Sequence, residues 1–283
     1  KWRGSVFIVD DNFIGNKRKV KELLPELAEW NARHRRPFTF FTEASLNLAD
    51  DQELLQLMKQ AGFIRVFLGI ETPVEESLKE AQKLQNTHRS LLDSVRRVQS
   101  YGIEVMAGFI VGFDNDPDDI FDRQVEFIQE SGIPLAMVGL LLALPGTQLY
   151  RRLLKEGRIR DEGHGNNMDV HLNFVPKMNP QRLLEGYKSI LQRIYHPDAY
   201  YDRVRRFLAQ CGPAHHPRRV LSDYFALARS IFKQGVRGNA RASYWKFFFE
   251  AATRYRHSFD TAITLAIMGY HFQTLTEIVC QSD

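Results

Sequence analysis

Five short apolar runs recur along the first half of the chain, and none of them alternates with polar residues. They are Val6–Val9, Phe38–Phe41, Val66–Ile70, Val105–Val111 and Met137–Leu142. A strand that is apolar on both faces needs cover on both, and parallel sheets flanked by helices provide that cover. The spacing of the runs leaves room for one helix between each pair. The pattern therefore predicts an α/β fold with a parallel sheet.

Helical patterns with start and stop signals fill the intervals between the runs. Asp50 and Glu53 form a capping-box pair, and Gly62 is placed where a helix would end. Thr72 and Glu75 repeat that pairing before the next helix. Strands that alternate with helices imply right-handed crossovers, and five strands are too few to close an eight-stranded barrel. We therefore predict a partial parallel (β/α) TIM-like barrel.

The pattern changes in the second half of the chain. From Pro180 onward the apolar residues recur with helical period, which predicts an all-α C-terminal domain over 176–283 after a barrel over 1–175. Residues 181–257 hold 15 Lys/Arg and 5 Asp/Glu, a net charge of +10. The whole chain carries +4, so the remainder carries −6. This uneven charge favours two units with different roles.

Composition excludes several classes of protein. A hydrophobic fraction of 44% and a charged fraction of 25% are ordinary for a globular protein. There is neither a spanning apolar run nor a signal peptide, so a cytoplasmic location is expected. The two cysteines, Cys211 and Cys280, are far apart and are interpreted as structural. His215 and His216 are interpreted as part of a solvated linker.

Polar residues and glycines follow the predicted strands where each strand ends. Asp11, Glu43 and Glu71 come after the first three runs, and Gly108 and Gly112 bracket the end of the fourth. The carboxyl ends of parallel strands share one edge of a sheet, and ligands bind there. Glu71 is the strongest candidate, because capping does not require it. Simpler roles stay open for the others: loop ordering for Asp11 and packing for the two glycines.

The same stretches, taken together, resemble radical S-adenosylmethionine (SAM) enzymes, in particular the subgroup that carries a cobalamin-binding domain. The similar stretches, in order, are VDDNF, FTEASLNLA, FLGIET, AGFIVGF and LLLALPGTQLY. They cover residues 1 to about 175. The later stretch IYHPDAYYDRVRRFL resembles an uncharacterised C-terminal domain found in part of that subgroup.

The resemblance implies a [4Fe–4S] cluster that cleaves SAM to a 5′-deoxyadenosyl radical. It implies that Glu71 contacts the methionine or ribose part of SAM, and that Asp11 and Glu43 line the same cavity. The stretch bearing Gly108, Ile110 and Gly112 would lie against the adenine. The resemblance extends more weakly to a further set of cofactor contacts, which comprises Lys83, Gln85 and Asn86.

One departure from the family matters for function. The family's CxxxCxxC motif follows the first barrel strand and is absent from this sequence, and thiolates are the ligands of such clusters. We therefore expect the barrel to lack its first strand, with that motif and the cobalamin-binding portion lying upstream of Lys1. The chain would then be a fragment of an enzyme that activates a C–H bond, with cobalamin-dependent methylation as one outcome. Alone, it is expected to be inactive and to bind no cofactor.

Other functions remain open on the sequence alone. The chain could be a non-catalytic binding or scaffold module, or a divalent-metal TIM-barrel lyase that uses Asp11, Glu43 and Glu71 as ligands. The substrate, whether a small molecule or a lipid, cannot be read from these residues. The basic C-terminal third raises contact with nucleic acid or a membrane. A helical lid with core aromatic residues is the favoured interpretation of that third.

Overall fold

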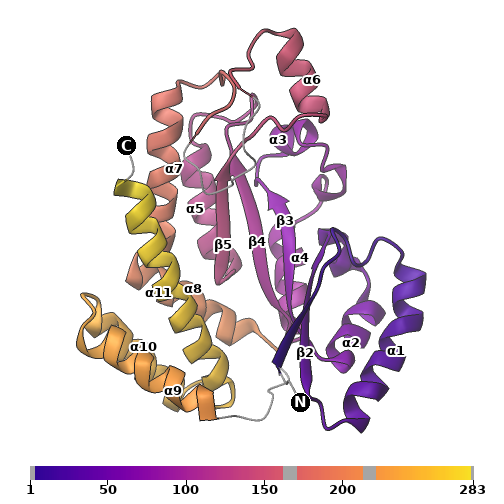
Figure 1. Ribbon diagram of the computed structural model, residues 1–283, viewed down its shortest axis with the longest axis vertical. Helices are drawn as coiled ribbons and strands as arrows, with labels where there is room; N and C mark the ends of the chain where they lie inside the picture. The colour runs from indigo at the N-terminus through magenta and orange to yellow at the C-terminus, as the bar shows by residue number, and fades with distance from the viewer. Residues whose placement is uncertain (1–3, 162–170, 213–220, 282–283) are drawn as a thin grey trace.

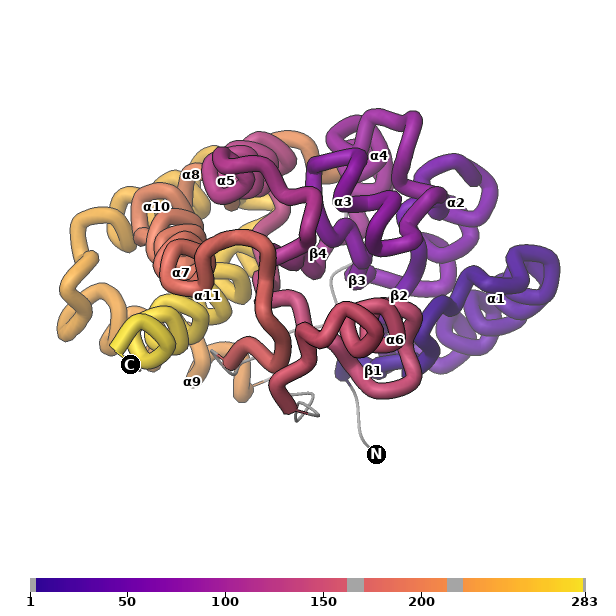
Figure 2. The backbone as a smooth tube through the Cα atoms, turned by 90° about the horizontal axis from the view of Figure 1, so that it is seen from above, coloured from indigo at the N-terminus to yellow at the C-terminus, as the bar shows by residue number. Residues whose placement is uncertain are grey.

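A curved parallel sheet forms the first half of the computed structural model, which describes residues 4–161, 171–212 and 221–281. Its strands are β1 (Gly4–Ile8), β2 (Phe38–Ala44), β3 (Phe63–Glu71), β4 (Glu104–Val111) and β5 (Leu135–Leu140). Every neighbouring pair is parallel, and the order in the sheet is the order in the sequence. Seen from above, the strands curl into an open half-barrel (Figure 2). The predicted parallel partial barrel is confirmed.

Helices cover the convex side of this sheet. They are α1 (Lys17–Arg33), α2 (Gln52–Ala61), α4 (Leu91–Ser100) and α5 (Ile120–Ser131). Shorter pieces lie in the connections: η1 (Leu46–Asp50), α3 (Glu75–Glu80) and η2 (Leu84–Asn86). Figure 2 shows α2, α4 and α5 on one side of the strands. The concave side has no comparable layer of helices among the described residues.

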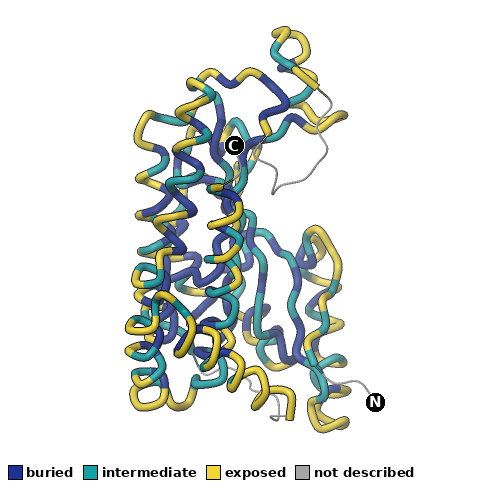
Figure 3. The backbone as a smooth tube through the Cα atoms, turned by 60° about the vertical axis from the view of Figure 1, so that its left-hand side comes forward, coloured by how far each residue is buried: buried dark blue, intermediate teal, exposed yellow. Residues whose placement is uncertain are grey.

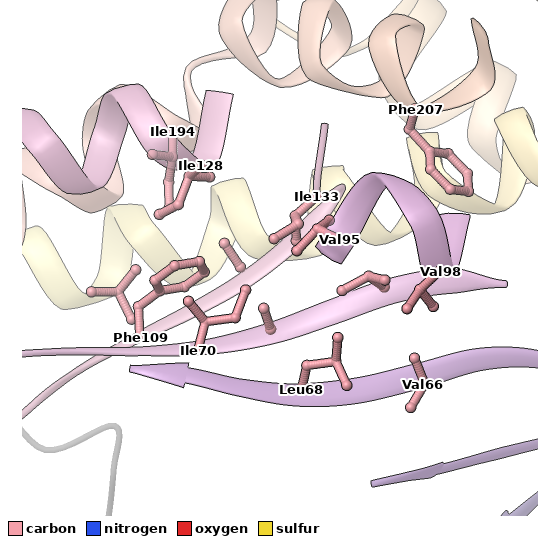
Figure 4. Packing of buried hydrophobic residues seen from close by; sticks show 14 of the residues in the cluster. Val66, Leu68, Ile70, Val95, Val98, Phe109, Ile128, Ile133, Ile194 and Phe207 are labelled. Atoms are coloured by element: carbon pink, nitrogen blue, oxygen red, sulfur yellow. The ribbon is translucent and has the colours of Figure 1, made fainter. Parts of the chain in front are cut away.

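The core lies between the sheet and these helices. Val66, Leu68 and Ile70 of β3 point toward the helical layer, where Val95 and Val98 of α4 meet them (Figure 4). All five side chains are fully buried. Burying a side chain of this size contributes roughly 1.5–3 kcal/mol relative to leaving it in water. Alternate residues of the same strands are left for the concave face.

The second half of the described chain is helical, as predicted. After α6 (Gln148–Lys155) come α7 (Pro180–Tyr195), α8 (Pro197–Gln210), α9 (Leu221–Ser230), η3 (Ile231–Val236), α10 (Arg241–Thr253), η4 (Arg256–Ser258) and α11 (Phe259–Gln281). The helices α7 and α8 pack beside β5 and α5 (Figure 1), and their apolar residues join the same core. A domain boundary at residue 175 therefore stays a prediction. No helix in the described ranges is long and apolar enough to cross a membrane.

Arg203 joins the two halves from a fully buried position on α8. Its guanidinium donates to the carbonyl oxygens of Ile194, at 2.7 Å, and Pro134, at 3.3 Å, and also to Oε1 of Gln129. The ring of Tyr195 lies 5.6 Å from the guanidinium carbon. A buried cation with this many acceptors is costly to remove, so Arg203 fixes the helical half against the sheet.

Two helix starts differ from the sequence prediction. Asp51, not Asp50, caps α2, with its Oδ1 accepting from the Leu54 amide at 3.0 Å. Thr72 is fully buried and accepts from the Val74 amide at 3.3 Å, so it closes a local turn while α3 begins three residues later at Glu75. At α2 the chain offers two aspartates of equal capping propensity, and tertiary position decides between them, whereas α3 begins after Val74 without a side-chain cap.

Candidate functional site

A row of paired side chains crosses the concave face near the amino ends of the strands. The rings of Phe7 and Phe41 stack with centroids 4.8 Å apart, and Arg65 follows in register on β3. Nη2 of Arg65 lies 3.0 Å from Oε2 of Glu104 on β4. Burial raises the pKa of the Glu104 carboxyl, and the neighbouring charge of Arg65 opposes that rise. This row closes the lower part of the half-barrel.

Glycines replace side chains nearer the carboxyl ends of the strands. Gly69 of β3 is paired in register with Gly108 of β4. A Cβ atom added at Gly108 would lie 3.0 Å from Cζ of Phe67, and one added at Gly69 would lie 2.6 Å from Oε1 of Glu71. The two glycines therefore make room for the Phe67 ring and the Glu71 carboxylate, which occupy the space that a side chain at either position would need.

Glu71 ends β3 in a strained conformation. Its φ is +69°, a value that residues with a Cβ rarely adopt, and the register with β4 shifts between Gly69 and Glu71. Its side chain is largely buried, and Oε1 lies 2.9 Å from Nζ of Lys83. Such strain is most often found at functional sites, where the surrounding contacts hold it in place. The structure therefore holds this carboxylate in a fixed position at the rim.

The segment that carries Lys83 is itself tied to the end of β3. Asn86, buried in η2, donates through Nδ2 to the carbonyl oxygens of Gly69, at 3.2 Å, and Ile70, at 3.4 Å. Its Oδ1 is buried and has no hydrogen-bond partner among the described residues. Lys83 and Asn86 thus hold Glu71 and the end of β3 in place. Gln85 is exposed and, within the described part of the chain, makes no hydrogen bond to either.

The ends of β1 and β2 are joined by a hydrogen-bonded turn. Oδ1 of Asn12 accepts from the amide of Ser45 at 3.1 Å, and the amide of Phe13 donates to the carbonyl oxygen of Glu43 at 3.0 Å. The residue Glu43 is half-buried, and Asp11 is exposed. Asp11, Glu43 and Glu71 therefore follow three adjacent strands at one edge of the sheet. Their contact with a ligand stays a prediction.

The remaining predicted residues lie on β4 and directly after it. Ile110 alternates with buried residues and lies in register with Gly139 of β5. Gly112 has φ +109°, and a Cβ atom there would lie 3.1 Å from Cδ2 of Leu183 on α7. Gly112 thus has the packing role that the sequence left open, together with the backbone freedom that its turn requires.

A metal-ligand role for the rim carboxylates finds no support in the geometry. Over the described ranges, no group of three or more His, Cys, Asp or Glu residues is arranged to hold a metal ion. Cys211 and Cys280 lie in the C-terminal half, far apart in sequence, and both are free thiols. Burial raises the pKa of Cys211 to about 12. His215 and His216 lie outside the described residues.

Sequence reasoning missed an ion-pair cluster beside this rim, made of Asp114, Arg158, Arg152 and Glu80. The side chain of Asp114 is nearly fully buried and meets Arg158 through two contacts of 2.6 and 2.8 Å. Arg152 bridges it to Glu80, at 2.9 and 2.6 Å respectively. Burial alone would raise the pKa of Asp114, but these cations together hold it below its ordinary value. The cluster fastens the segment around α6 to the loop after β4.

Asp116, in the same loop, accepts through Oδ2 from the amides of Gly112, at 2.8 Å, and Phe113, at 3.0 Å. Its Oδ1 accepts from the Ser77 hydroxyl at 2.7 Å. Burial raises the pKa of this carboxyl despite the three hydrogen bonds. Asp116 thus closes the turn after β4 and ties that turn to α3.

A parallel half-barrel with a fixed carboxylate at its rim places the chain among β/α-barrel proteins, a class whose ligands bind at the carboxyl ends of the strands. Comparison with known proteins makes this class specific. Residues 2–128 match the family model of the radical SAM superfamily, and residues 147–283 match a domain of unknown function, DUF4070. Through its half-barrel, the chain belongs to the radical SAM superfamily.

Several relatives are methylating enzymes by name. The chain is 44% identical to an uncharacterized methyltransferase of Synechocystis, over 99% of this chain and 53% of the relative. It is 34% identical to hopanoid C-2 methylase of Rhodopseudomonas palustris, over 95% and 51% respectively. A bacteriochlorophyllide d C-12(1)-methyltransferase of Chlorobaculum tepidum is 25% identical over 70% of this chain and 42% of the relative. The chain spans about half the length of the first two relatives.

Proposed function

We propose that the protein containing this chain is a radical SAM methylase, and that this chain supplies most of its SAM-binding face. The observation that carries the proposal is Glu71. Its carboxylate sits at the strand end in a left-handed backbone conformation, paired with Lys83. The methylating relatives support methyl transfer as the outcome.

The residues present on the concave face fit SAM. The paired glycines Gly69 and Gly108 make room for the Glu71 carboxylate and the Phe67 ring, a polar and a flat apolar group that suit the ribose and the adenine. A carboxylate is the natural acceptor for ribose hydroxyls and for the ammonium of the methionine part. Glu43, half-buried on the neighbouring strand, supplies a second acceptor on the same side.

The residues of this chain do not fit the iron–sulfur cluster. A [4Fe–4S] cluster that cleaves SAM needs three cysteine thiolates close together, and this sequence has two cysteines that lie far apart. The thiolates would have to come from residues outside this chain. When bound, such a cluster supplies the electron that cleaves SAM. A cobalamin requirement is proposed from the resemblance alone.

In this proposal the chain's own residues bind and orient SAM. Lys83 neutralises one oxygen of Glu71 and holds the carboxylate toward the rim, while Asn86 holds the segment that bears Lys83. The Asp114 cluster keeps the segment around α6 in place beside the same rim. These contacts prearrange the binding face, which lowers the entropy lost when a ligand binds.

The alternative of a non-catalytic module keeps the fold without SAM recognition. Isothermal titration calorimetry with SAM discriminates between the two. The sequence led us to expect no cofactor on this chain alone, but the fixed Glu71 carboxylate leads us to expect weak, measurable SAM binding by the wild type even without the cluster that would ligate the methionine part. Glu71→Gln should weaken it by about tenfold, the effect of one charge-assisted hydrogen bond.

A matched control is Glu53→Gln, which removes a carboxylate from an exposed pair with Lys21. It should leave SAM binding unchanged. Equal affinities of wild type and Glu71→Gln would remove Glu71 from the site. Absence of SAM binding by the wild type, with the fold intact by circular dichroism, would favour the non-catalytic module.

A further inference from the structure

An exposed apolar stripe runs along α9 and η3, and nothing in the radical chemistry uses it. The stripe consists of Leu221, Tyr224, Phe225, Phe232 and Val236, whose residue exposures are 72%, 55%, 67%, 53% and 53%. Their spacing places them along one side of a continuous helical segment. A surface helix of a globular protein ordinarily turns such a stripe toward the core, so an outward stripe marks a contact surface.

The side of this segment that faces the protein carries a buried polar network beside Ile231, which packs against the core. Ser230 and Gln234 are buried, and Nε2 of Gln234 donates to the Ser230 hydroxyl at 2.9 Å. The hydroxyls of Ser230 and Tyr244 lie 3.2 Å apart, and the Tyr201 hydroxyl donates to Oε1 of Gln234 at 3.2 Å. These hydrogen bonds anchor the segment by its polar side. Its apolar side is therefore left outward by the fold, and turning the helix inward would break the buried network.

Cations surround the stripe. Residues 221–256 contain seven Lys/Arg and two Asp/Glu, a net charge of +5. Arg229, Lys233 and Lys246 take part in no ion pair with the described residues. The guanidinium carbon of Arg237 lies 5.7 Å from the ring centroid of Phe232, which places positive charge directly at the stripe.

The stripe is also accessible from one side of the molecule. Figure 1 shows α9 at the end of the helical half, away from the carboxyl ends of the strands, and Figure 3 shows this region as largely exposed. In Figure 2, α9 lies on the side opposite α2, α4 and α5. A flat partner can therefore reach it without meeting the helical layer of the half-barrel.

We propose that the α9–η3 stripe docks on an anionic lipid bilayer. Aromatic and aliphatic side chains flanked by Lys and Arg are what an interfacial helix presents to lipid headgroups and acyl chains. Aliphatic Leu221 and Val236 at the two ends of the stripe offer no stacking surface to nucleic acid bases. A second copy of the chain would bring two faces of net positive charge together. The charge of the surface thus favours an anionic partner and the apolar stripe favours lipid.

This inference goes beyond the proposed methylation and does not depend on SAM binding. The test is cosedimentation of the 283-residue chain with vesicles of phosphatidylcholine alone or mixed with phosphatidylglycerol, at low and high salt. The chain should bind the mixed vesicles more tightly, and salt should weaken the binding. Phe225→Ser combined with Phe232→Ser should reduce the partition coefficient at least tenfold, because two aromatic side chains no longer enter the bilayer.

Charge and position are tested separately. Arg229→Gln and Lys233→Gln should each reduce binding to the mixed vesicles by about fivefold and leave binding to neutral vesicles unchanged. The matched control, Leu23→Ser with Leu154→Ser, removes exposed apolar residues from α1 and α6 and should have no effect. Circular dichroism confirms the fold of each variant.

Three results would overturn the proposal. The first is vesicle binding by the double Phe variant equal to that of the wild type. The second is a dimer in sedimentation velocity that this variant dissociates, which would assign the stripe to a second copy. The third is salt-sensitive binding of a labelled RNA without binding of either vesicle, which would assign the basic surface to nucleic acid.

Discussion

At the scale of single residues, Glu71 combines a strained backbone with a candidate binding role. Its φ of +69° costs an alanine roughly 1–2 kcal/mol but costs glycine nothing. Glu71→Gly and Glu71→Ala both lose the ion pair with Lys83, so any difference in their stability comes from the backbone conformation. We expect Glu71→Gly to be more stable than Glu71→Ala by about 1 kcal/mol in urea unfolding, with SAM binding equally weak in both. Equal stabilities would show that the strain is absent.

Asp114 offers a second prediction, about pH. Its pKa in the fold lies below the ordinary value of 3.8, so its ion pairs contribute stability above that value and lose it as pH falls through the lower, folded pKa. Asp114→Asn should cost about 2–3 kcal/mol at neutral pH, because the nearly buried carboxylate that pairs with Arg158 and Arg152 is lost. That difference from wild type should shrink below about pH 4. Urea unfolding across pH measures it.

The control is Asp118→Asn, which removes a carboxylate from an exposed pair with Arg182. Its cost should stay within about 0.5 kcal/mol at every pH. A loss at Asp114 that does not change with pH would contradict an ionic origin. It would instead point to the shape of the side chain.

At the scale of elements, the sequence predicts Asp50 as the cap of α2, but Asp51 caps the helix in the structure. Asp51 accepts from the Leu54 amide and lies 3.0 Å from Nζ of Lys21, whereas Asp50 pairs with Arg89 at the surface. Asp51→Ala should cost about 1 kcal/mol. Asp50→Ala should cost less than about 0.5 kcal/mol. Thermal or urea unfolding measures the stability of both variants. A larger loss for Asp50→Ala than for Asp51→Ala would show that Asp50 is the cap.

The elements also show what the sequence could predict. The five strands were found because apolar runs such as Val105–Val111 reflect burial on both faces, a property of the local chain. The rim carboxylates followed, since strand ends share an edge. The Asp114 cluster was missed because Arg152 and Arg158 are distant from Asp114 in the sequence, so no local pattern pairs them. The outward stripe of α9 was missed because helical spacing does not say which side faces the core.

At the scale of the whole molecule, one apolar core and several hydrogen bonds extend across residue 175, where the sequence predicts a domain boundary. Arg203 of α8 donates to Gln129 of α5 and to Pro134 before β5, and Tyr195 of α7 donates to the carbonyl oxygen of Ala136 at 2.8 Å. These bonds cross between the half-barrel and the helical part. We therefore expect one cooperative unfolding transition for both halves.

Two single-tryptophan variants make this testable, because Trp30 lies in α1 and Trp245 in α10. Urea midpoints from the two fluorescence signals should coincide. Arg203→Leu should lower both by the same amount, corresponding to about 3 kcal/mol, since it leaves buried carbonyl oxygens without a donor. Arg206→Leu, an exposed position on the same helix, should change neither midpoint. A shift in the Trp245 signal alone would establish the two independent domains that the sequence suggested.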